Sequence, residues 1–222
     1  MEAKHISSPV YEDGQIIVLD KPAGMDSEHQ LPAALRELWG NPEAFVGLVH
    51  RLDAGVSGLM VCAKTSDAAA ALSRQVQAGT FRKEYRAVIA GGPDEALPGA
   101  GQLRDYLFKD SRAGRVYPVK RLRKGVREAV LNYRILDTRD GEQGLLSLVE
   151  IQLETGRTHQ IRVQFASRRH PLWGDGKYGS RYKGAIALQS ARLAFSHPET
   201  GQPLVFTLPA PPCSPWALFP LF

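Results

Sequence analysis

The sequence has few of the features that mark secreted, membrane-spanning or zinc-binding proteins. Of its 222 residues only Cys62 and Cys213 are cysteines, and Cys62 sits in the apolar run LMVCA. Two isolated thiols are typical of a reduced protein without structural disulfides or zinc. No apolar run approaches the roughly 18 to 20 residues that span a bilayer, and the first fourteen residues do not resemble a secretory signal. We therefore expect a cytoplasmic protein that has no membrane partner.

Motifs that hold nucleotides, metals or an activated serine are also missing. The chain has no GxGxxG after a strand, no GxxxxGK[ST] and no GxSxG, and its glycine-rich segment GDGKYGS (174–180) has the wrong spacing for a phosphate loop. None of the six histidines has a ligand spacing such as HxxxH. The sequence therefore predicts a protein that uses no cofactor and no metal.

Basic residues are gathered into two segments. Residues 1–50 carry a net charge of −5, whereas 101–134 hold 10 basic and 3 acidic side chains and 151–183 carry a net charge of +5. Such clustering is typical of a protein that neutralises phosphates, although a solvated basic face is the alternative. Arginine, whose planar fork suits phosphate, dominates both segments. The candidate nucleic-acid contacts in the first segment are Arg121, Arg123 and Lys124.

Hydrophobic patterning predicts an α+β fold with a mixed, mainly antiparallel sheet flanked by helices and loops. Strands are expected at 14–24, 58–65 and 82–91, an antiparallel pair at 127–136 and 144–154, and a hairpin at 191–209. Helices are expected at 31–40, 66–79 and 157–169, the second with Ser66 as its N-cap. The chain has no internal repeat and no long linker, so we expect residues 1–222 to form a single domain.

Three segments carry side chains suited to chemistry. Asp53 lies in HRLDAGVSG, between a strand and a glycine-containing loop, and Tyr85 alternates along the strand KEYRAV. His159 and Arg162 lie three residues apart in GRTHQIRVQ, so they share a helix face. A turn residue or a packed tyrosine would explain the first two equally well. Arg162 stands between apolar residues, and a buried guanidinium needs an anionic partner, for which Asp53 is the candidate.

Taken together, these segments resemble the signature motifs of the RluA-type pseudouridine synthase family. HRLDAGVSGLMVCAKT, KEYRAV and GRTHQIRVQFASRRHPLWGDGKYG occur in the family's order, and VLDKPAGM and LAFSHPETGQPLVF match flanking blocks. The resemblance covers about residues 15 to 209. It implies the pseudouridine synthase fold, with an active-site cleft across the sheet.

The resemblance also implies a role for each motif residue. Asp53 would be the catalytic aspartate, and Arg162 the arginine that pairs with it. Tyr85 would be the active-site tyrosine, which stacks on the target base and is a candidate base. Arg51 would enter the RNA and help to expel the target nucleotide. His159 is a further candidate RNA-binding residue. The expected substrate is structured RNA, either ribosomal or transfer RNA, and the expected state is a monomer.

Two departures and two alternatives accompany this interpretation. Val56 stands where the family more often has threonine, and the first motif begins so early that we expect no separate N-terminal RNA-binding domain. Recognition of RNA would then rest on the catalytic domain, with segment 101–134 as the candidate surface.

One alternative is a non-catalytic RNA-binding module of the same fold. The other is a hydrolase that uses Asp53 or Asp175 with a metal.

Overall fold

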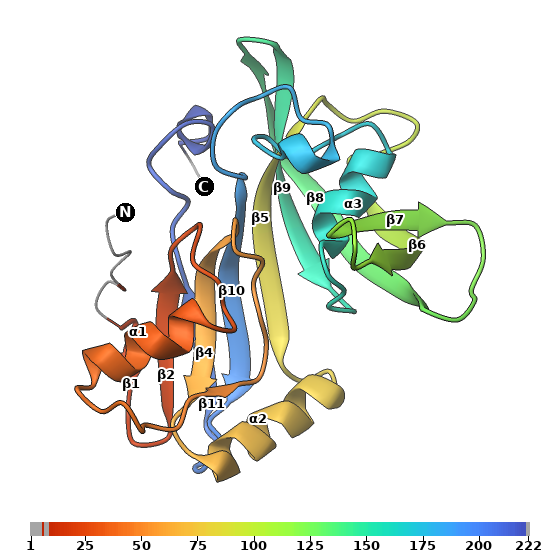
Figure 1. The fold of residues 1–222 in the computed structure, drawn as a ribbon. Coiled ribbons are helices and arrows are strands. Elements are labelled where there is room, and N and C mark those ends of the chain that lie inside the picture. The colour runs from red at the N-terminus through yellow and green to blue at the C-terminus, as the bar shows by residue number, and fades with distance from the viewer. Residues whose placement is uncertain (1–5, 7–8, 221–222) are drawn as a thin grey trace. The chain divides into compact units, whose positions relative to one another are not determined.

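The structure is a computed structural model that describes residue 6 and residues 9–220. Its strands are β1 (Tyr11–Glu12), β2 (Ile16–Lys21), β3 (Gly47–Leu48), β4 (Ser57–Ala63), β5 (Arg82–Ala90), β6 (Ala100–Asp110), β7 (Arg115–Val119), β8 (Val126–Gly141), β9 (Gly144–Leu153), β10 (Leu188–Ser196) and β11 (Pro203–Thr207) (Figure 1). Its helices are α1 (Gln30–Leu38), α2 (Ser66–Gln77) and α3 (Gln160–Ser167), with short 3₁₀ turns η1 (Gly176–Tyr178) and η2 (Trp216–Leu218). Within the described ranges, no helix has the length and apolar character of a membrane span.

The chain divides into two compact units. Unit 1 comprises the residues up to Lys83 together with Gln189–Pro209, and unit 2 comprises Glu84–Leu188 and the residues from Ala210 onward. Each unit carries strands that pair mainly antiparallel and at least one packed helix, which confirms the predicted α+β fold. The single domain and the cleft across the sheet stay predictions.

In unit 1 the strands run in the order β1-β2-β4-β10, with β3 paired to β4 and β11 to β10. The pairing of β4 with β10 is parallel, while β2 with β4 and β10 with β11 are antiparallel. Gly58 lets β4 approach β10, because it adopts φ +117° and a Cβ there would lie 2.4 Å from the carbonyl oxygen of Ser190. The glycine that follows the HRLD loop therefore fixes where that loop enters the sheet.

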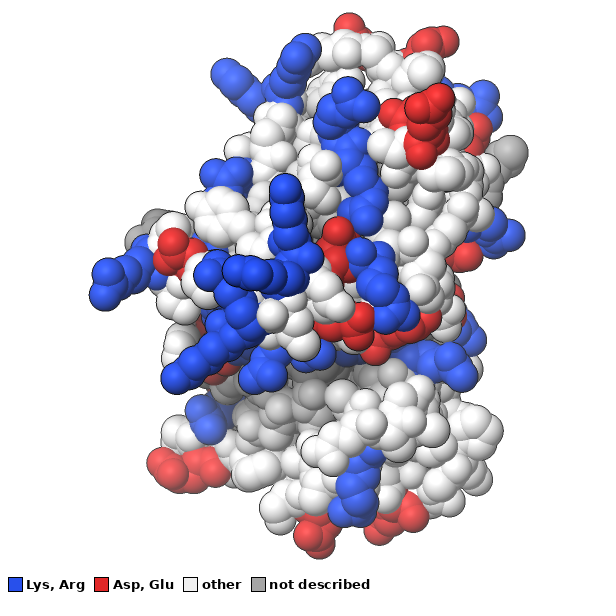
Figure 2. Space-filling view, turned by 90° about the vertical axis from the view of Figure 1, so that its right-hand side faces the viewer, with Lys and Arg blue, Asp and Glu red and all other residues white. Residues whose placement is uncertain are grey.

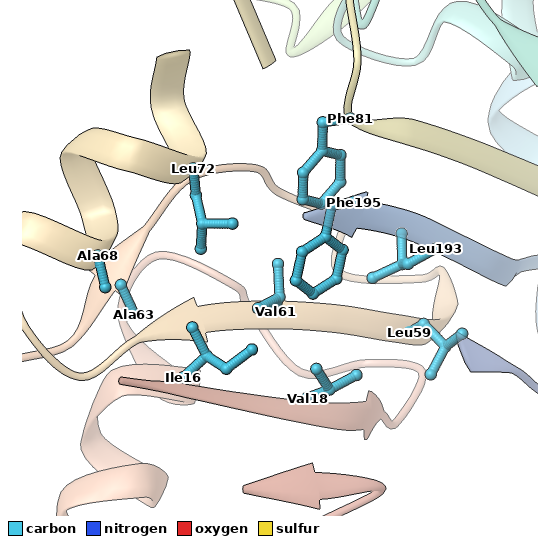
Figure 3. Close-up of a cluster of buried hydrophobic side chains, with 10 residues drawn as sticks. All are labelled: Ile16, Val18, Leu59, Val61, Ala63, Ala68, Leu72, Phe81, Leu193 and Phe195. Carbon is cyan, nitrogen blue, oxygen red and sulfur yellow. The ribbon is translucent and has the colours of Figure 1, made fainter. Parts of the chain in front are cut away.

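The core of unit 1 lies between this sheet and α2 (Figure 3). Phe81 and Phe195 stack with ring centroids 5.1 Å apart within it. The cap of α2 lies one residue earlier than predicted: Thr65 is the N-cap, and its hydroxyl accepts from the Ala68 amide at 3.2 Å. Thr65 is extended whereas Ser66 is already helical, so the threonine and not the predicted Ser66 satisfies a free amide of the first turn.

In unit 2 the strands run in the order β5-β9-β8-β6-β7, and every pairing among them is antiparallel. The predicted pair at 127–136 and 144–154 is the long β8–β9 hairpin. Strands β6 and β7 were not predicted, and Pro118 explains part of this, since proline within an apolar run argues against a strand. Helix α3 lies beside β6 and β7 (Figure 1) and is shorter than the predicted 157–169.

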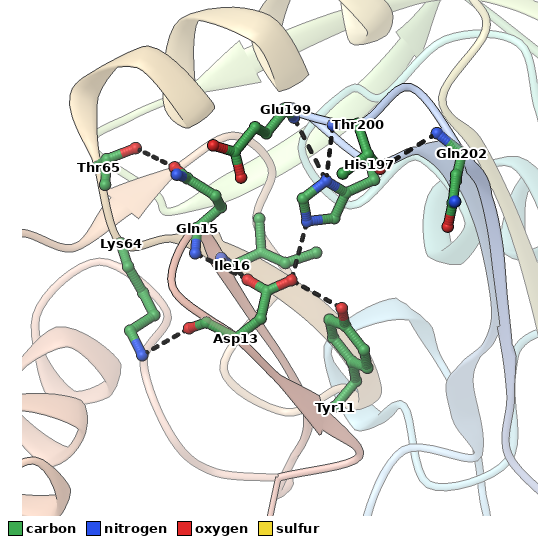
Figure 4. Close-up of polar contacts among 10 residues, drawn as sticks. All are labelled: Tyr11, Asp13, Gln15, Ile16, Lys64, Thr65, His197, Glu199, Thr200 and Gln202. Atoms are coloured by element: carbon green, nitrogen blue, oxygen red, sulfur yellow. Dashed lines mark hydrogen bonds and ion pairs between the residues drawn. The ribbon is translucent and has the colours of Figure 1, made fainter.

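A partly buried polar network ties two turns of unit 1 together (Figure 4). Asp13 Oδ1 accepts from the Gln15 and Ile16 amides at 2.7 and 2.8 Å. Asp13 Oδ2 accepts from Tyr11 Oη at 2.7 Å and lies 2.8 Å from His197 Nε2. Burial raises the pKa of this carboxyl, but the hydrogen bonds outweigh burial and lower the pKa to about 2.

We expect Asp13→Asn to destabilise the protein by about 1 kcal/mol near neutral pH, after allowance for solvent screening. Because the folded-state pKa lies below the ordinary value of 3.8, this stabilisation is complete above that value and is lost as pH falls through about 2. Urea unfolding at a series of pH values should show the two proteins converging in acid.

Glu199→Gln is the matched control, because Glu199 is an exposed carboxylate in the same turn as His197. Its stability difference from wild type should stay within about 0.5 kcal/mol at every pH. A wild-type advantage over Asp13→Asn that persists undiminished at pH values of about 2 and below would contradict the network as described.

Candidate functional site

Asp53 lies at the start of a tight turn in unit 1. Its carbonyl oxygen accepts from the Val56 amide at 2.9 Å, and its side chain is partly exposed. The residues on either side are held by other segments: Ser27 Oγ donates to the Leu52 carbonyl at 2.7 Å, and Gly24 N donates to the Ala54 carbonyl at 2.5 Å. The backbone that carries this carboxylate is therefore fixed both before and after it.

Lys21 is a further support of this loop that the sequence analysis did not identify. Its side chain is fully buried, and its Nζ donates to the carbonyls of Pro22 and Met25 at 2.9 Å and of Ala54 at 3.4 Å. An amino group is buried at such cost only when several acceptors satisfy it. The VLDKPAGM block, which was expected only to flank the motifs, thus contributes a polar support to the Asp53 loop.

His50 and Arg51 precede Asp53 in the same motif, and one is buried while the other is exposed. His50 is buried, its Nε2 accepts from the Val61 amide at 3.1 Å, and burial lowers its pKa to about 3, with nearby Lys83 adding to the effect. The imidazole is therefore neutral and anchors the loop to β4. Arg51 is exposed and forms an ion pair with Glu28, with both side chains at least half exposed.

Arg162 is held in unit 2 by a two-bond ion pair. Its Nε and Nη2 donate to the two carboxylate oxygens of Asp175 at 2.7 and 2.9 Å, and the side chains are 7% and 1% exposed. The prediction that Arg162 is a buried guanidinium with an anionic partner fits this geometry. Asp175 is a partner that the sequence analysis had considered only as a possible metal ligand, and both of its carboxylate oxygens accept from arginine.

The turn that carries Asp175 allows almost no substitution at its first glycine. Gly174 adopts φ +77°, and a Cβ there would lie 2.3 Å from the Ala185 carbonyl oxygen. The Asp175 carbonyl then accepts from the amides of Tyr178 and Ser180 at 3.0 and 3.1 Å. The segment GDGKYGS is therefore a structural turn that aims a carboxylate at α3, which explains why its glycines do not follow a phosphate-loop spacing.

Tyr178 joins His159 to Arg162. The Arg162 guanidinium carbon lies 5.2 Å from the centre of the Tyr178 ring, and the Tyr178 hydroxyl oxygen lies 2.8 Å from His159 Nδ1. His159 is the N-cap of α3 and adopts a left-handed backbone at φ 52°. His159 therefore lies just outside the helix and does not share a helix face with Arg162 as the sequence analysis expected, and Tyr178, which that analysis had not singled out, contacts both residues.

The other predicted site residues lie on β5 and on the connection between β7 and β8. Tyr85 lies on β5, is buried, and stands opposite Ile151 of β9. Arg121, Arg123 and Lys124 lie on the exposed connection between β7 and β8. Asp53 and Arg51 belong to unit 1, whereas the other predicted residues belong to unit 2, so an encounter of Asp53 with Tyr85 and Arg162 stays a prediction.

Asp175→Asn should lower the free energy of unfolding by about 3 to 5 kcal/mol, because it removes the carboxylate charge from a buried ion pair while the Arg162 charge stays in place. The double variant Arg162→Met/Asp175→Leu should recover most of that stability, since it removes both charges. Urea titrations of the three proteins measure this. Asp137→Asn, which breaks the surface pair with Arg139, is the control and should cost less than about 1 kcal/mol. Equal destabilisation at the two aspartates would contradict a special role for the buried pair.

Comparison with known proteins agrees with this arrangement of motifs. Residues 15–167 match the family described as RNA pseudouridylate synthase. The chain is 37% identical to the ribosomal large subunit pseudouridine synthase D of Neisseria meningitidis serogroup B, over 91% of this chain and 58% of that protein. It is 36% identical to the protein of the same name from Vibrio cholerae serotype O1, over 91% of this chain and 67% of that protein. The chain therefore spans only part of the length of these relatives.

Solved structures show the same fold. Human RNA Pseudouridylate Synthase Domain Containing 1 superposes with a TM-score of 0.79 at 22% identity, covering 96% of this chain and 86% of that one. Human RNA Pseudouridylate Synthase Domain Containing 4 gives a TM-score of 0.72 at 23% identity, covering 91% and 88%. The family match covers more than half of the chain and includes Asp53, Tyr85 and Arg162. The chain thus belongs to the RluA-type RNA pseudouridylate synthase family.

Proposed function

We propose that this chain converts uridine to pseudouridine in large-subunit ribosomal RNA, with Asp53 as the catalytic carboxylate. In this isomerisation the bond from the sugar to uracil N1 breaks, the uracil turns, and a bond forms from the sugar to C5. The C5 hydrogen leaves as a proton and N1 gains one, so the reaction needs neither an oxidant nor an energy source. The ribosomal substrate is proposed because relatives that are 36% and 37% identical to the chain over the aligned stretch are named ribosomal large subunit pseudouridine synthases.

The observation that carries the proposal is the way unit 1 presents Asp53. Its carboxylate is partly exposed, while the backbone on both sides is pinned through the Leu52 and Ala54 carbonyls. A group that attacks a sugar carbon, or removes a proton in an elimination route, must be held within a fraction of an ångström. An aspartate that only closed a turn would not need its backbone to be held on both sides.

Tyr85 and Arg162 are proposed as partners of Asp53 from the second unit. A tyrosine ring offers a face on which the uracil can stack while it turns, an interaction worth roughly 1–3 kcal/mol per base. Arg162 is already fixed by Asp175, so its guanidinium is preorganised and loses little entropy when it meets an anion. The carboxylate of Asp53 is the anion that we propose for it.

Arg51 is proposed to fill the space that the target nucleotide leaves in the RNA. Unstacking that nucleotide costs a few kcal/mol, and a guanidinium stacked in its place offsets part of the cost. The ion pair of Arg51 with Glu28 is exposed at both ends. Such pairs contribute about 0–1 kcal/mol, so phosphate or base can replace Glu28 at little cost.

Asp53→Asn should lower pseudouridine formation by about 10²- to 10⁴-fold, because the amide neither attacks nor accepts a proton as the carboxylate does. The measurement is tritium release from RNA labelled at uridine C5, on ribosomal RNA and on transfer RNA separately. RNA affinity of the variant should stay within about threefold of wild type, since the side chains are isosteric.

The controls separate this proposal from its alternatives. Asp67→Asn, at an exposed aspartate in the first turn of α2, should leave tritium release unchanged within about twofold. A wild-type chain that binds ribosomal RNA tightly but releases no tritium would favour the non-catalytic binding module. Release from transfer RNA alone would replace the ribosomal substrate with the transfer one.

The connection between β7 and β8 is proposed as a phosphate-binding surface. Arg121, Arg123 and Lys124 are all exposed there, and Lys and Arg side chains gather on the face of the molecule that carries this connection (Figure 2). Neutralising Arg121 and Lys124 together should weaken RNA binding. It should also reduce the slope of log K against log salt by roughly 0.7 for each phosphate that the variant no longer neutralises.

The matched control is the pair Arg134→Ala and Arg139→Ala. Both arginines are exposed in the same unit, but each already forms an ion pair with a neighbouring acid. We expect the double variant at Arg134 and Arg139 to change the salt slope by less than half as much as the double variant at Arg121 and Lys124. Equal slopes for both double variants would place the RNA elsewhere on the protein.

A further inference from the structure

The β6–β7 hairpin carries two aromatic rings side by side. Phe108 of β6 and Tyr117 of β7 are register partners, and directly opposite residues of an antiparallel pair project to the same face. Phe108 is half-buried, whereas Tyr117 is 41% exposed. Beyond β7, Leu122 is 62% exposed among basic side chains. The hairpin therefore presents an exposed aromatic ring beside a half-buried one in a segment rich in basic side chains.

Each of the two rings also faces a guanidinium. The Arg115 guanidinium carbon lies 5.7 Å from the centre of the Tyr117 ring, and that of Arg123 lies 5.6 Å from the centre of the Phe108 ring. Both distances are within the range of cation–π attraction. We call this group of four side chains, Phe108, Arg115, Tyr117 and Arg123, the aromatic–arginine platform.

We propose that the aromatic–arginine platform binds an unpaired nucleotide of the RNA substrate, by stacking its base on the exposed face of Tyr117. This inference rests on the proposed function, which supplies RNA as the partner. Rings interleaved with arginines are the combination that binds single-stranded nucleic acid, because every base has a π-face and every linkage has a negative phosphate. A paired base is excluded, since its faces are already stacked within the helix and the deep groove of A-form RNA hides its edges.

The platform is connected to the Arg162 arrangement within unit 2. Arg115 lies against two rings, because its guanidinium carbon is also 5.3 Å from the centre of the Tyr178 ring. The Val116 amide, next along β7, donates to the Tyr178 hydroxyl at 3.0 Å. Tyr178 in turn carries the Arg162 guanidinium on its ring. A nucleotide on Tyr117 would therefore be held at a fixed position relative to Arg162, which suits recognition of a base other than the target.

The test compares the binding of three probes to the full chain at several salt concentrations. The probes are a single-stranded ribosomal RNA fragment of about 12 nucleotides, the same strand with abasic sugars, and its duplex. Wild type should bind the intact single strand at least about fivefold more tightly than the abasic strand, which has the same charge. Tyr117→Leu should reduce that preference and leave the salt slope unchanged, because the base that stacks on Tyr85 is unaffected, whereas Tyr117→Phe should keep the preference in full.

Two controls make the result specific to the ring. Leu122→Ala removes an exposed apolar side chain from the neighbouring connection, and it should preserve the preference for the intact strand. Thermal unfolding of Tyr117→Leu should match wild type within a few degrees, since the residue is partly exposed on an edge strand. Tyr117→Phe retains the aromatic ring. If it binds as wild type does, the loss in Tyr117→Leu comes from the missing ring and not from misfolding.

Failure of the platform differs from failure of the proposed function. Equal affinity of wild type for intact and abasic strands overturns the platform, as does unchanged preference in Tyr117→Leu, even when wild type releases tritium from ribosomal RNA. A wild-type chain that binds no RNA and releases no tritium overturns both. If an acidic peptide of equal charge displaces the intact strand as well from wild type as from Tyr117→Leu, the hairpin is a general anion-binding surface. That result would overturn the stacking proposal.

Discussion

The buried pair of Arg162 and Asp175 is the interaction on which the arrangement of unit 2 depends. Two opposite charges out of water stabilise a protein only when their geometry is close to ideal, and here two parallel hydrogen bonds provide that geometry. The residues around the ion pair must also be placed so that this geometry is possible. Helix α3 must present Arg162, the turn after Gly174 must present Asp175, and Tyr178 must lie against the guanidinium. One ion pair thus determines how helix α3 and the turn 174–180 meet.

Unit 1 follows the same physical rule with a different residue. Lys21 is buried, and three carbonyls accept from its amino group, one of them beside Asp53. In each unit a costly buried charge therefore supports a side chain that we propose for catalysis: Lys21 supports the loop of Asp53, and Asp175 supports Arg162. A cost of this kind is tolerated where rigidity of the site matters more than stability.

The exposed charges show the opposite pattern. Arg51 pairs with Glu28 at the surface, and the exposed Arg123 rests on the Phe108 ring of the β6–β7 hairpin. These contacts are weak and solvent-accessible, so a polyanion can exchange with them at little cost. Buried charges thus hold the side chains that we propose for catalysis, while exposed charges stay available to the proposed RNA substrate.

The sequence by itself determined the fold class, most strands, and the motif residues, because local periodicity and the short motifs are encoded in neighbouring residues. The β8–β9 hairpin and α2 are examples, with the cap of α2 displaced by one residue to Thr65. Strands β6 and β7 escaped prediction, since the edge strand contains Pro118 and much of the hairpin is charged.

Only the tertiary structure decided which buried groups meet. Asp175 lies 13 residues from Arg162, and Lys21 lies 33 residues from Ala54. No periodicity connects such positions, because their contact depends on how the intervening chain packs. The same reason explains Tyr178, which local pattern marks as an ordinary aromatic residue, and which packing places between His159 and Arg162.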